Sequence, residues 1–167
     1  MPDTTRKDYT MKTRIVFTLS ICLLLAAACA PAPAATPAAT GMDSWQTYSN
    51  PAGFSIRYPA AWSKEEVPQK AGDTFQTVSL KGAEGGVDLH WGVGFGGACP
   101  QGYTTVKVAD GELSTCYSKN ADGTELWTQI NKELATTSFS AEARTNNAEQ
   151  ASHDLVLQVL STLSFSK

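Results

Sequence analysis

The chain has 167 residues, of which 13 are Lys or Arg and 16 are Asp or Glu, so its formal net charge is −3. This length suits one domain built around a single hydrophobic core. The mildly acidic balance, without a cluster of basic residues, excludes nucleic acid and anionic lipid headgroups as expected partners.

The amino-terminal segment has the layout of an export signal. The basic stretch MKTR begins at Met11, the apolar run IVFTLSICLLLAAA follows, and Cys29 comes next. A positive region, an apolar region and a small-residue processing site are typical of signal peptides. The apolar run is about fourteen residues long, shorter than the roughly twenty that a membrane-spanning helix needs. We therefore expect residues 1–28 to be a removed leader, with Met11 as an alternative start of translation.

The end of this leader, Leu25-Ala26-Ala27-Ala28-Cys29, resembles the lipobox of bacterial lipoproteins. The resemblance implies that Cys29 is acylated and becomes the first mature residue, and that its acyl chains anchor the protein to a bacterial membrane. Ordinary secretion, with cleavage at a triplet such as Ala30-Pro31-Ala32, is the alternative. Either route predicts an extracytoplasmic location in the cell envelope.

Residues 29–43 are predicted to be a spacer. The stretch APAPAATPAATGMD after Cys29 is rich in Ala, Pro and Thr and is almost uncharged. Such a composition gives an extended, semi-rigid linker that cannot build a core. We expect it to hold a globular domain, residues 44–167, away from the membrane surface.

Strand patterns dominate the first part of that domain. Residues 54–58 alternate apolar and polar side chains, and Pro59 closes the run. Turns rich in Gly, Asn and Asp, among them Asp110-Gly111 and 120–123, separate later runs and predict hairpins. The expected strands cover residues 54–58, 75–80, 87–93, 103–108, 113–119, 125–130 and 137–143.

The period changes after residues 146–147, where a helix over 148–163 is predicted. Ser152 and Asp154 lie near its start, as expected of a cap and a dipole partner. One helical stripe carries the apolar residues Leu155, Val156, Val159, Leu160 and Leu163. The predicted fold class is α+β, an antiparallel β-sheet meander with a carboxy-terminal helix packed on one face.

Cys99 and Cys116 are expected to form a disulfide. Cys22 leaves with the leader and Cys29 takes the lipid, so these two remain as a pair in an oxidising compartment. In the chain-entropy model such a bridge adds about 3 kcal/mol. A metal site or a redox pair is the alternative, although neither cysteine belongs to a Cys-x-x-Cys motif or has a histidine near it in sequence.

Residues 48–62, YSNPAGFSIRYPAAW, resemble the opening of PsbP-like domains, the superfamily fold of the photosystem II extrinsic protein PsbP. Residues 159–165, VLSTLSF, are similar to that family's last helix and the short strand after it. The resemblance implies a compact sheet with helices on its faces. It also implies a non-catalytic binding or scaffold module, with another envelope protein as its partner. No cofactor site transfers from the family to a residue of this chain.

Two tryptophans are candidates for contacts with a ligand or a partner. Trp127 shares a strand face with Glu125 and Gln129, so a half-exposed ring is expected, and Trp45 lies where the spacer meets the domain. Exposed tryptophans serve as binding anchors or sugar platforms. They favour the alternative of a small-ligand or glycan-binding module.

Asp88 and His90 are the other candidates. They lie two apart in a predicted strand, so both side chains leave one face, toward solvent, while Leu89, Trp91 and Val93 are expected in the core. This pair supports a further alternative, a metal-dependent enzyme; otherwise it belongs to a solvated polar face.

Three other features predict no chemistry. The sequence has no Gly-x-Ser-x-Gly motif, so no catalytic residue is assigned. The glycines of residues 92–97 precede Cys99-Pro100 rather than a helix, and they predict close backbone approach instead of a phosphate loop. His153 is expected to be exposed. We accordingly predict neither an enzyme nor a cofactor.

Overall fold

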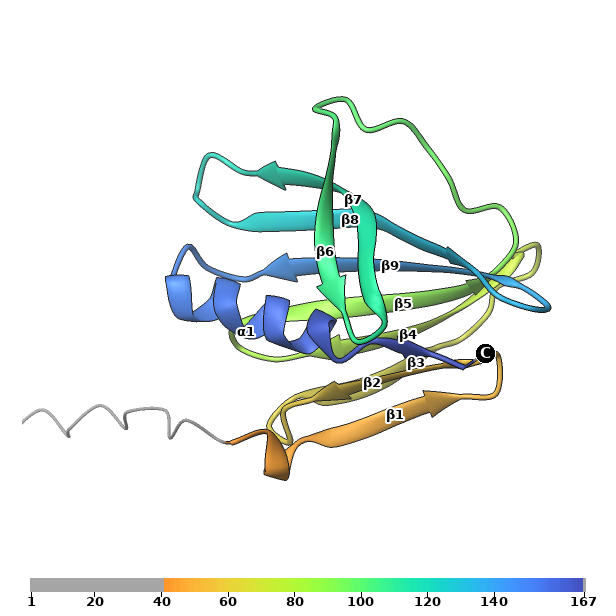
Figure 1. The fold of residues 1–167 in the computed structure, drawn as a ribbon, viewed down its shortest axis with the longest axis horizontal. Helices are drawn as coiled ribbons and strands as arrows, with labels where there is room; N and C mark the ends of the chain where they lie inside the picture. The colour runs from red at the N-terminus through yellow and green to blue at the C-terminus, as the bar shows by residue number, and fades with distance from the viewer. Residues whose placement is uncertain (1–40, 167) are drawn as a thin grey trace, which may run out of the picture. The chain divides into compact units, whose positions relative to one another are not determined.

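The computed structural model describes residues 41–166 of the chain. This part contains ten strands, a 3-10 helix and one α-helix (Figure 1). The helices are η1 (Met42–Ser44) and α1 (Gln150–Ser161). The strands are β1 (Gln46–Asn50), β2 (Phe54–Tyr58), β3 (Ser63–Val67), β4 (Phe75–Lys81), β5 (Gly85–Gly92), β6 (Tyr103–Val108), β7 (Gly111–Lys119), β8 (Glu125–Glu133), β9 (Ser138–Thr145) and β10 (Ser164–Phe165). The predicted α+β class is confirmed.

The predicted leader, Cys29 and most of the predicted spacer lie outside the described residues. Within residues 41–166, no helix is long and apolar enough to cross a membrane.

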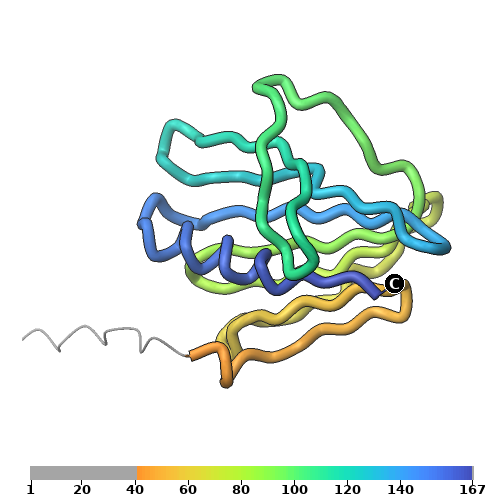
Figure 2. Tube along the Cα trace, viewed as in Figure 1, coloured from red at the N-terminus to blue at the C-terminus, as the bar shows by residue number. Residues whose placement is uncertain are grey.

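The strands form two antiparallel sheets. The small sheet has the order β1-β2-β10 and the large sheet the order β3-β4-β5-β9-β8-β7-β6. The predicted hairpins β4–β5, β6–β7 and β7–β8 are confirmed. The order is not a simple meander, because β9 returns to lie beside β5 (Figures 1 and 2). The strand order places β6 at one edge of this sheet.

One face of the large sheet carries the core. Leu89 on β5 and Phe139 on β9 are fully buried on this face, as is Ile130 on β8. α1 packs its apolar stripe onto this layer through Val156, Val159 and Leu160, each fully buried. Removing such side chains from water supplies most of the favourable free energy of folding.

The start of α1 differs from the prediction. The helix begins at Gln150, so Ser152 lies inside its first turn with only 1% of its surface exposed. Asp154 accepts a hydrogen bond from Gln150 Nε2 at 2.8 Å. The turn before the helix is instead held by Asn147, whose side-chain oxygen accepts the Glu149 N–H at 3.0 Å. The predicted cap is therefore wrong.

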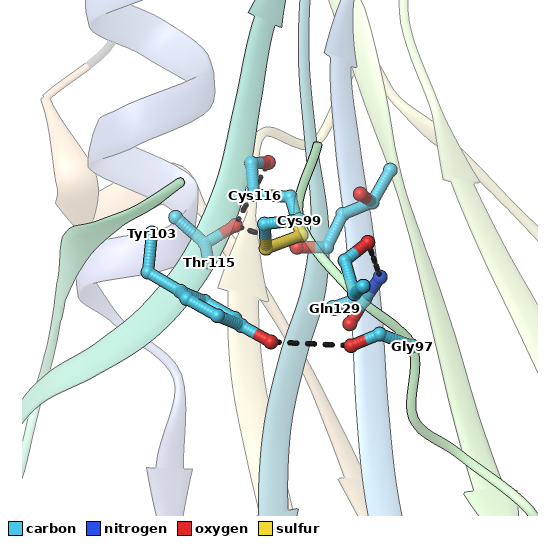
Figure 3. Close-up of a disulfide and its surroundings, with 8 residues drawn as sticks. Gly97, Cys99, Tyr103, Thr115, Cys116 and Gln129 are labelled. Carbon is cyan, nitrogen blue, oxygen red and sulfur yellow. Dashed lines mark hydrogen bonds between the residues drawn. A yellow bond between two sulfur atoms is a disulfide. The ribbon is translucent and has the colours of Figure 1, made fainter. Parts of the chain in front are cut away.

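The predicted disulfide joins Cys99 to Cys116, with 5.3 Å between their Cα atoms (Figure 3). It ties the 93–102 loop to β7, and the Tyr103 hydroxyl donates to the Gly97 carbonyl at 3.1 Å in the same loop.

Close backbone approach is confirmed at Gly92. Its φ is 152°, and a Cβ there would lie 2.3 Å from the Thr74 carbonyl oxygen. Val93 comes directly after β5 and is 60% exposed. The prediction that it lies in the core is therefore wrong.

Candidate functional site

Trp127 is buried, contrary to the half-exposed ring expected from its polar neighbours. Only 3% of its surface is accessible. The expectation failed because Glu125, on the same strand, is itself buried among hydrogen-bond partners and does not mark a solvent-facing side. Gln129 lies in a β-bulge between Trp127 and Ile130, with a φ of 56°, and so leaves the simple alternation.

A pocket of about 560 Å³ lies between α1 and β6, and Trp127 lines it. Tyr117 of β7 and Leu157 of α1 add apolar surface, with the Tyr117 and Trp127 ring centroids 5.5 Å apart. Thr104 of β6 and Gln158 of α1 are exposed residues at its edge. Its other lining residues include one lysine and one aspartate, so apolar walls are combined with polar and charged groups. The volume falls within the usual range of small-molecule sites.

A polar network stands beside the aromatic residues of this pocket. Glu125 Oε1 accepts the Tyr117 hydroxyl at 2.7 Å and Lys119 Nζ at 3.4 Å. Glu125 Oε2 is bonded to His153 Nδ1, and the His153 and Trp127 ring centroids are 5.5 Å apart. His153 also lines the pocket. The expectation that His153 is simply exposed was wrong, since its side chain retains 29% exposure and is tied to the sheet.

The hydrogen bonds of this network determine the protonation state of the Glu125 carboxyl. Burial alone would raise the pKa of its carboxyl, but the hydrogen bonds from His153 and Tyr117 outweigh it and hold the pKa below the ordinary value. Near neutral pH the carboxyl is ionised, so His153 Nδ1 donates the proton of their shared bond. In a neutral ring Nε2 is then an acceptor, available to an N–H or O–H group in the pocket.

Sequence reasoning missed this site because its parts are far apart in the chain. His153 lies on α1 and Glu125 on β8, and only the packing of the helix on the sheet brings them together. The one available signal was Glu125 itself, an acidic residue that alternates with Trp127 on the face covered by the helix.

Asp88 and His90 lie on one face of β5, as predicted, but they are partly buried rather than solvated. Asp88 Oδ2 accepts a hydrogen bond from Arg144 at 2.6 Å, and its other oxygen accepts one from Ser79. Burial would raise the pKa of Asp88, but these bonds from Ser79 and Arg144 prevail and lower it. The carboxylate is thus committed to neighbours within the sheet.

His90 is engaged separately from Asp88. Its Nδ1 is 2.9 Å from the Thr77 hydroxyl, and its ring lies beside those of Phe75 and Phe95. Burial lowers the pKa of this imidazole. Within residues 41–166, no group of three His, Cys, Asp or Glu side chains gathers where it could hold a metal ion.

Trp45 is also buried, with 8% of its surface exposed, and belongs to the hydrophobic core. It follows η1 directly, near the start of the described residues. Its indole is therefore not an exposed anchor, which corrects the expectation drawn from its position next to the spacer.

A crystal structure from Bacteroides thetaiotaomicron VPI-5482 at 1.50 Å resolution is similar to this chain. The identity is 15% and the TM-score 0.43, and the match covers 74% of this chain. The match spans 49% of that protein, about half its length. No protein-family model matches the sequence, and no curated protein matches it.

Proposed function

We propose that this protein is a lipid-anchored extracytoplasmic binding module of the bacterial envelope, with a PsbP-like domain. Its predicted export signal and its lipobox-like Cys29 support the location. A disulfide within the domain fits an oxidising compartment. The buried Trp62 and the strands over 48–58 fit the family resemblance.

The pocket between α1 and β6 is the binding site in this proposal. The observation that carries it is the combination of Trp127, Tyr117 and Leu157 as apolar walls with the Glu125-oriented imidazole of His153. The walls suit a ligand with an aromatic or aliphatic body. His153 Nε2 suits one hydrogen-bond donor on that ligand. We propose a neutral, mostly apolar small molecule, bound without chemical change.

The fluorescent probe N-phenyl-1-naphthylamine tests this site, because it has an apolar body, one N–H group and an emission that rises on leaving water. We expect saturable binding to the folded domain. Gln158→Trp places a large ring at the pocket edge and should weaken binding at least about tenfold, or about 1.4 kcal/mol.

The matched control is Ala151→Trp, which adds the same ring at an exposed position of α1 that does not line the pocket. It should leave affinity unchanged. Equal probe affinity in the two variants, or no saturable binding to the wild type, would contradict the proposal that this pocket binds a small molecule.

A second candidate function is a scaffold role toward another envelope protein. The observation that favours it is exposed apolar surface on and beside the large sheet, with Val67 41%, Phe75 37% and Val93 60% exposed. Crosslinking of the native protein in isolated membranes, followed by mass spectrometry, tests this role. One recurrent, near-stoichiometric neighbour is expected, and an abundant folded protein that captures none would contradict it.

A further inference from the structure

A second hollow, which we call the inter-sheet cleft, lies where β1 of the small sheet faces β3 and β4 of the large sheet. Its volume is about 720 Å³. β1 and β3 are each the edge strand of their sheet, so the cleft opens between two strands that have one free side. None of the residues that line this cleft lines the pocket between α1 and β6.

Polar side chains occupy a sheet face that is apolar elsewhere. On β4, Gln76 lies on the same face as Val78 and Leu80, which are at most 1% exposed. On β3, Lys64 pairs in register with Leu80 and Glu66 with Val78, so both also belong to that face. All three polar residues line the inter-sheet cleft. This end of the interlayer space is therefore lined by exposed polar side chains rather than filled by apolar ones.

Aromatic rings stand among these polar groups. Trp91, on β5, pairs in register with Gln76, is half-buried and packs on Phe54 with 5.6 Å between centroids. Tyr48 and Tyr58 line the cleft from the small sheet. Asn50 Nδ2 donates to the Tyr48 hydroxyl at 2.8 Å, which leaves the hydroxyl proton of Tyr48 for another acceptor.

The charges of the cleft compensate each other. Lys64 Nζ lies 3.0 Å from Glu66 Oε1 and 5.4 Å from the Tyr48 ring centroid. These are the only charged side chains that line the cleft within the described residues. An ionic ligand would meet an already neutralised pair, whereas a neutral ligand with many hydroxyls can use both partners as donor and acceptor.

We propose that the inter-sheet cleft binds a neutral oligosaccharide. Its C–H faces would stack on Trp91 and Tyr48, and its hydroxyls would bond to Glu66, Lys64 and the Gln76 amide. This site is independent of the proposed small-molecule pocket.

Titration of the 15N-tryptophan-labelled protein with neutral trisaccharides tests the proposal. The probes are maltotriose, cellotriose and triacetylchitotriose, each up to about 10 mM, a concentration that detects even weak sites. The indole N–H signals are assigned with single Trp→Phe variants. We expect at least one trisaccharide to shift the Trp91 signal while leaving that of Trp127 in place.

Two carboxylates that are adjacent on β3 give a matched pair of variants. Glu66→Gln removes a charge from the cleft and should weaken binding about tenfold, as expected when a hydrogen bond to a charged group is lost. Glu65→Gln removes one from the opposite face, where Glu65 pairs with Lys81, and should leave affinity unchanged. The proposal is overturned if none of the three sugars shifts Trp91, if the shift is at Trp127 instead, or if the two variants bind equally.

Discussion

At the scale of single residues, Glu125 connects two residues that line the pocket. Its carboxylate holds His153 from the helix and Tyr117 from the neighbouring strand, so two elements are joined through one buried group. Orientation of an imidazole by a carboxylate fixes the tautomer that it presents on its other side. In a neutral ring this orientation leaves Nε2 as a hydrogen-bond acceptor beside the aromatic walls, which is the basis of the specificity that we propose.

Removing this charge should change the acid stability of the domain. Because the pKa of Glu125 is lowered from about 4.5 on folding, its contribution is fully present above that value and is lost as pH falls through the lower, folded value. Glu125→Gln should therefore flatten the loss of unfolding free energy below about pH 4.5. Urea denaturation at a series of pH values measures this dependence.

The control for this prediction is Glu112→Gln, on β7, where the carboxylate is exposed. That variant should retain the wild-type pH dependence. Identical profiles for wild type and Glu125→Gln would contradict a lowered pKa of Glu125 in the folded protein.

At the scale of elements, local signals predicted the hairpins and non-local pairing escaped prediction. The Asp110-Gly111 turn and the alternation of apolar and polar residues on either side of it predict β6 and β7 from the local sequence. β9 was recognised as a strand from Phe139, Ala141 and Ala143, but its place between β5 and β8 depends on contacts between distant segments. β3 went unrecognised because it is charged and exposed on an edge.

For the candidate site, too, local features were predictable from the sequence and non-local ones were not. The disulfide was predictable from the cysteine count together with the predicted compartment, and the shared face of Asp88 and His90 from strand alternation. The burial of Trp127 and its contact with His153 required knowledge of where α1 packs. Sequence alternation reports the face of a strand, and it does not report which element covers that face.

The disulfide should be a major local restraint on the 93–102 loop. It closes a sequence separation of 17 residues. Replacing both cysteines, Cys99→Ser with Cys116→Ser, should lower the free energy of unfolding by about 3 kcal/mol through added entropy of the unfolded chain. Chemical denaturation of the double variant beside the wild type measures the difference, with reductant on the wild type as an independent check. A loss well below about 1 kcal/mol would contradict the chain-entropy account of this bridge.

At the scale of the whole molecule, we propose that the predicted lipid anchor determines location and that the described domain binds ligands or partners. The anchor would restrict the domain to one membrane surface, and a spacer of about fourteen residues would let it reach ligands or neighbours there. In this arrangement the domain needs no apolar membrane-binding face of its own. The lipid alone should decide where the protein is found.

The variant Cys29→Ser tests whether the predicted lipid anchor determines the location of the protein. The wild-type protein should sediment with membranes and carry the mass of acyl groups on Cys29, whereas the variant should be recovered without them in the soluble extracytoplasmic fraction. Cys22→Ser, within the predicted leader, serves as the control and should behave as the wild type. Retention of Cys29→Ser on the membrane, or an unmodified Cys29 in the wild type, would contradict lipid anchoring.

Native mass spectrometry of the full-length protein, purified from its own membranes, tests whether the pocket between α1 and β6 holds a small molecule. We expect a second species, heavier by the mass of one small neutral molecule. It should persist in Ala151→Trp and be absent from Gln158→Trp, in which the pocket over Trp127 is blocked. A bound molecule that survives equally in both variants, or a folded wild type without any, would contradict the claim that this pocket is the binding site.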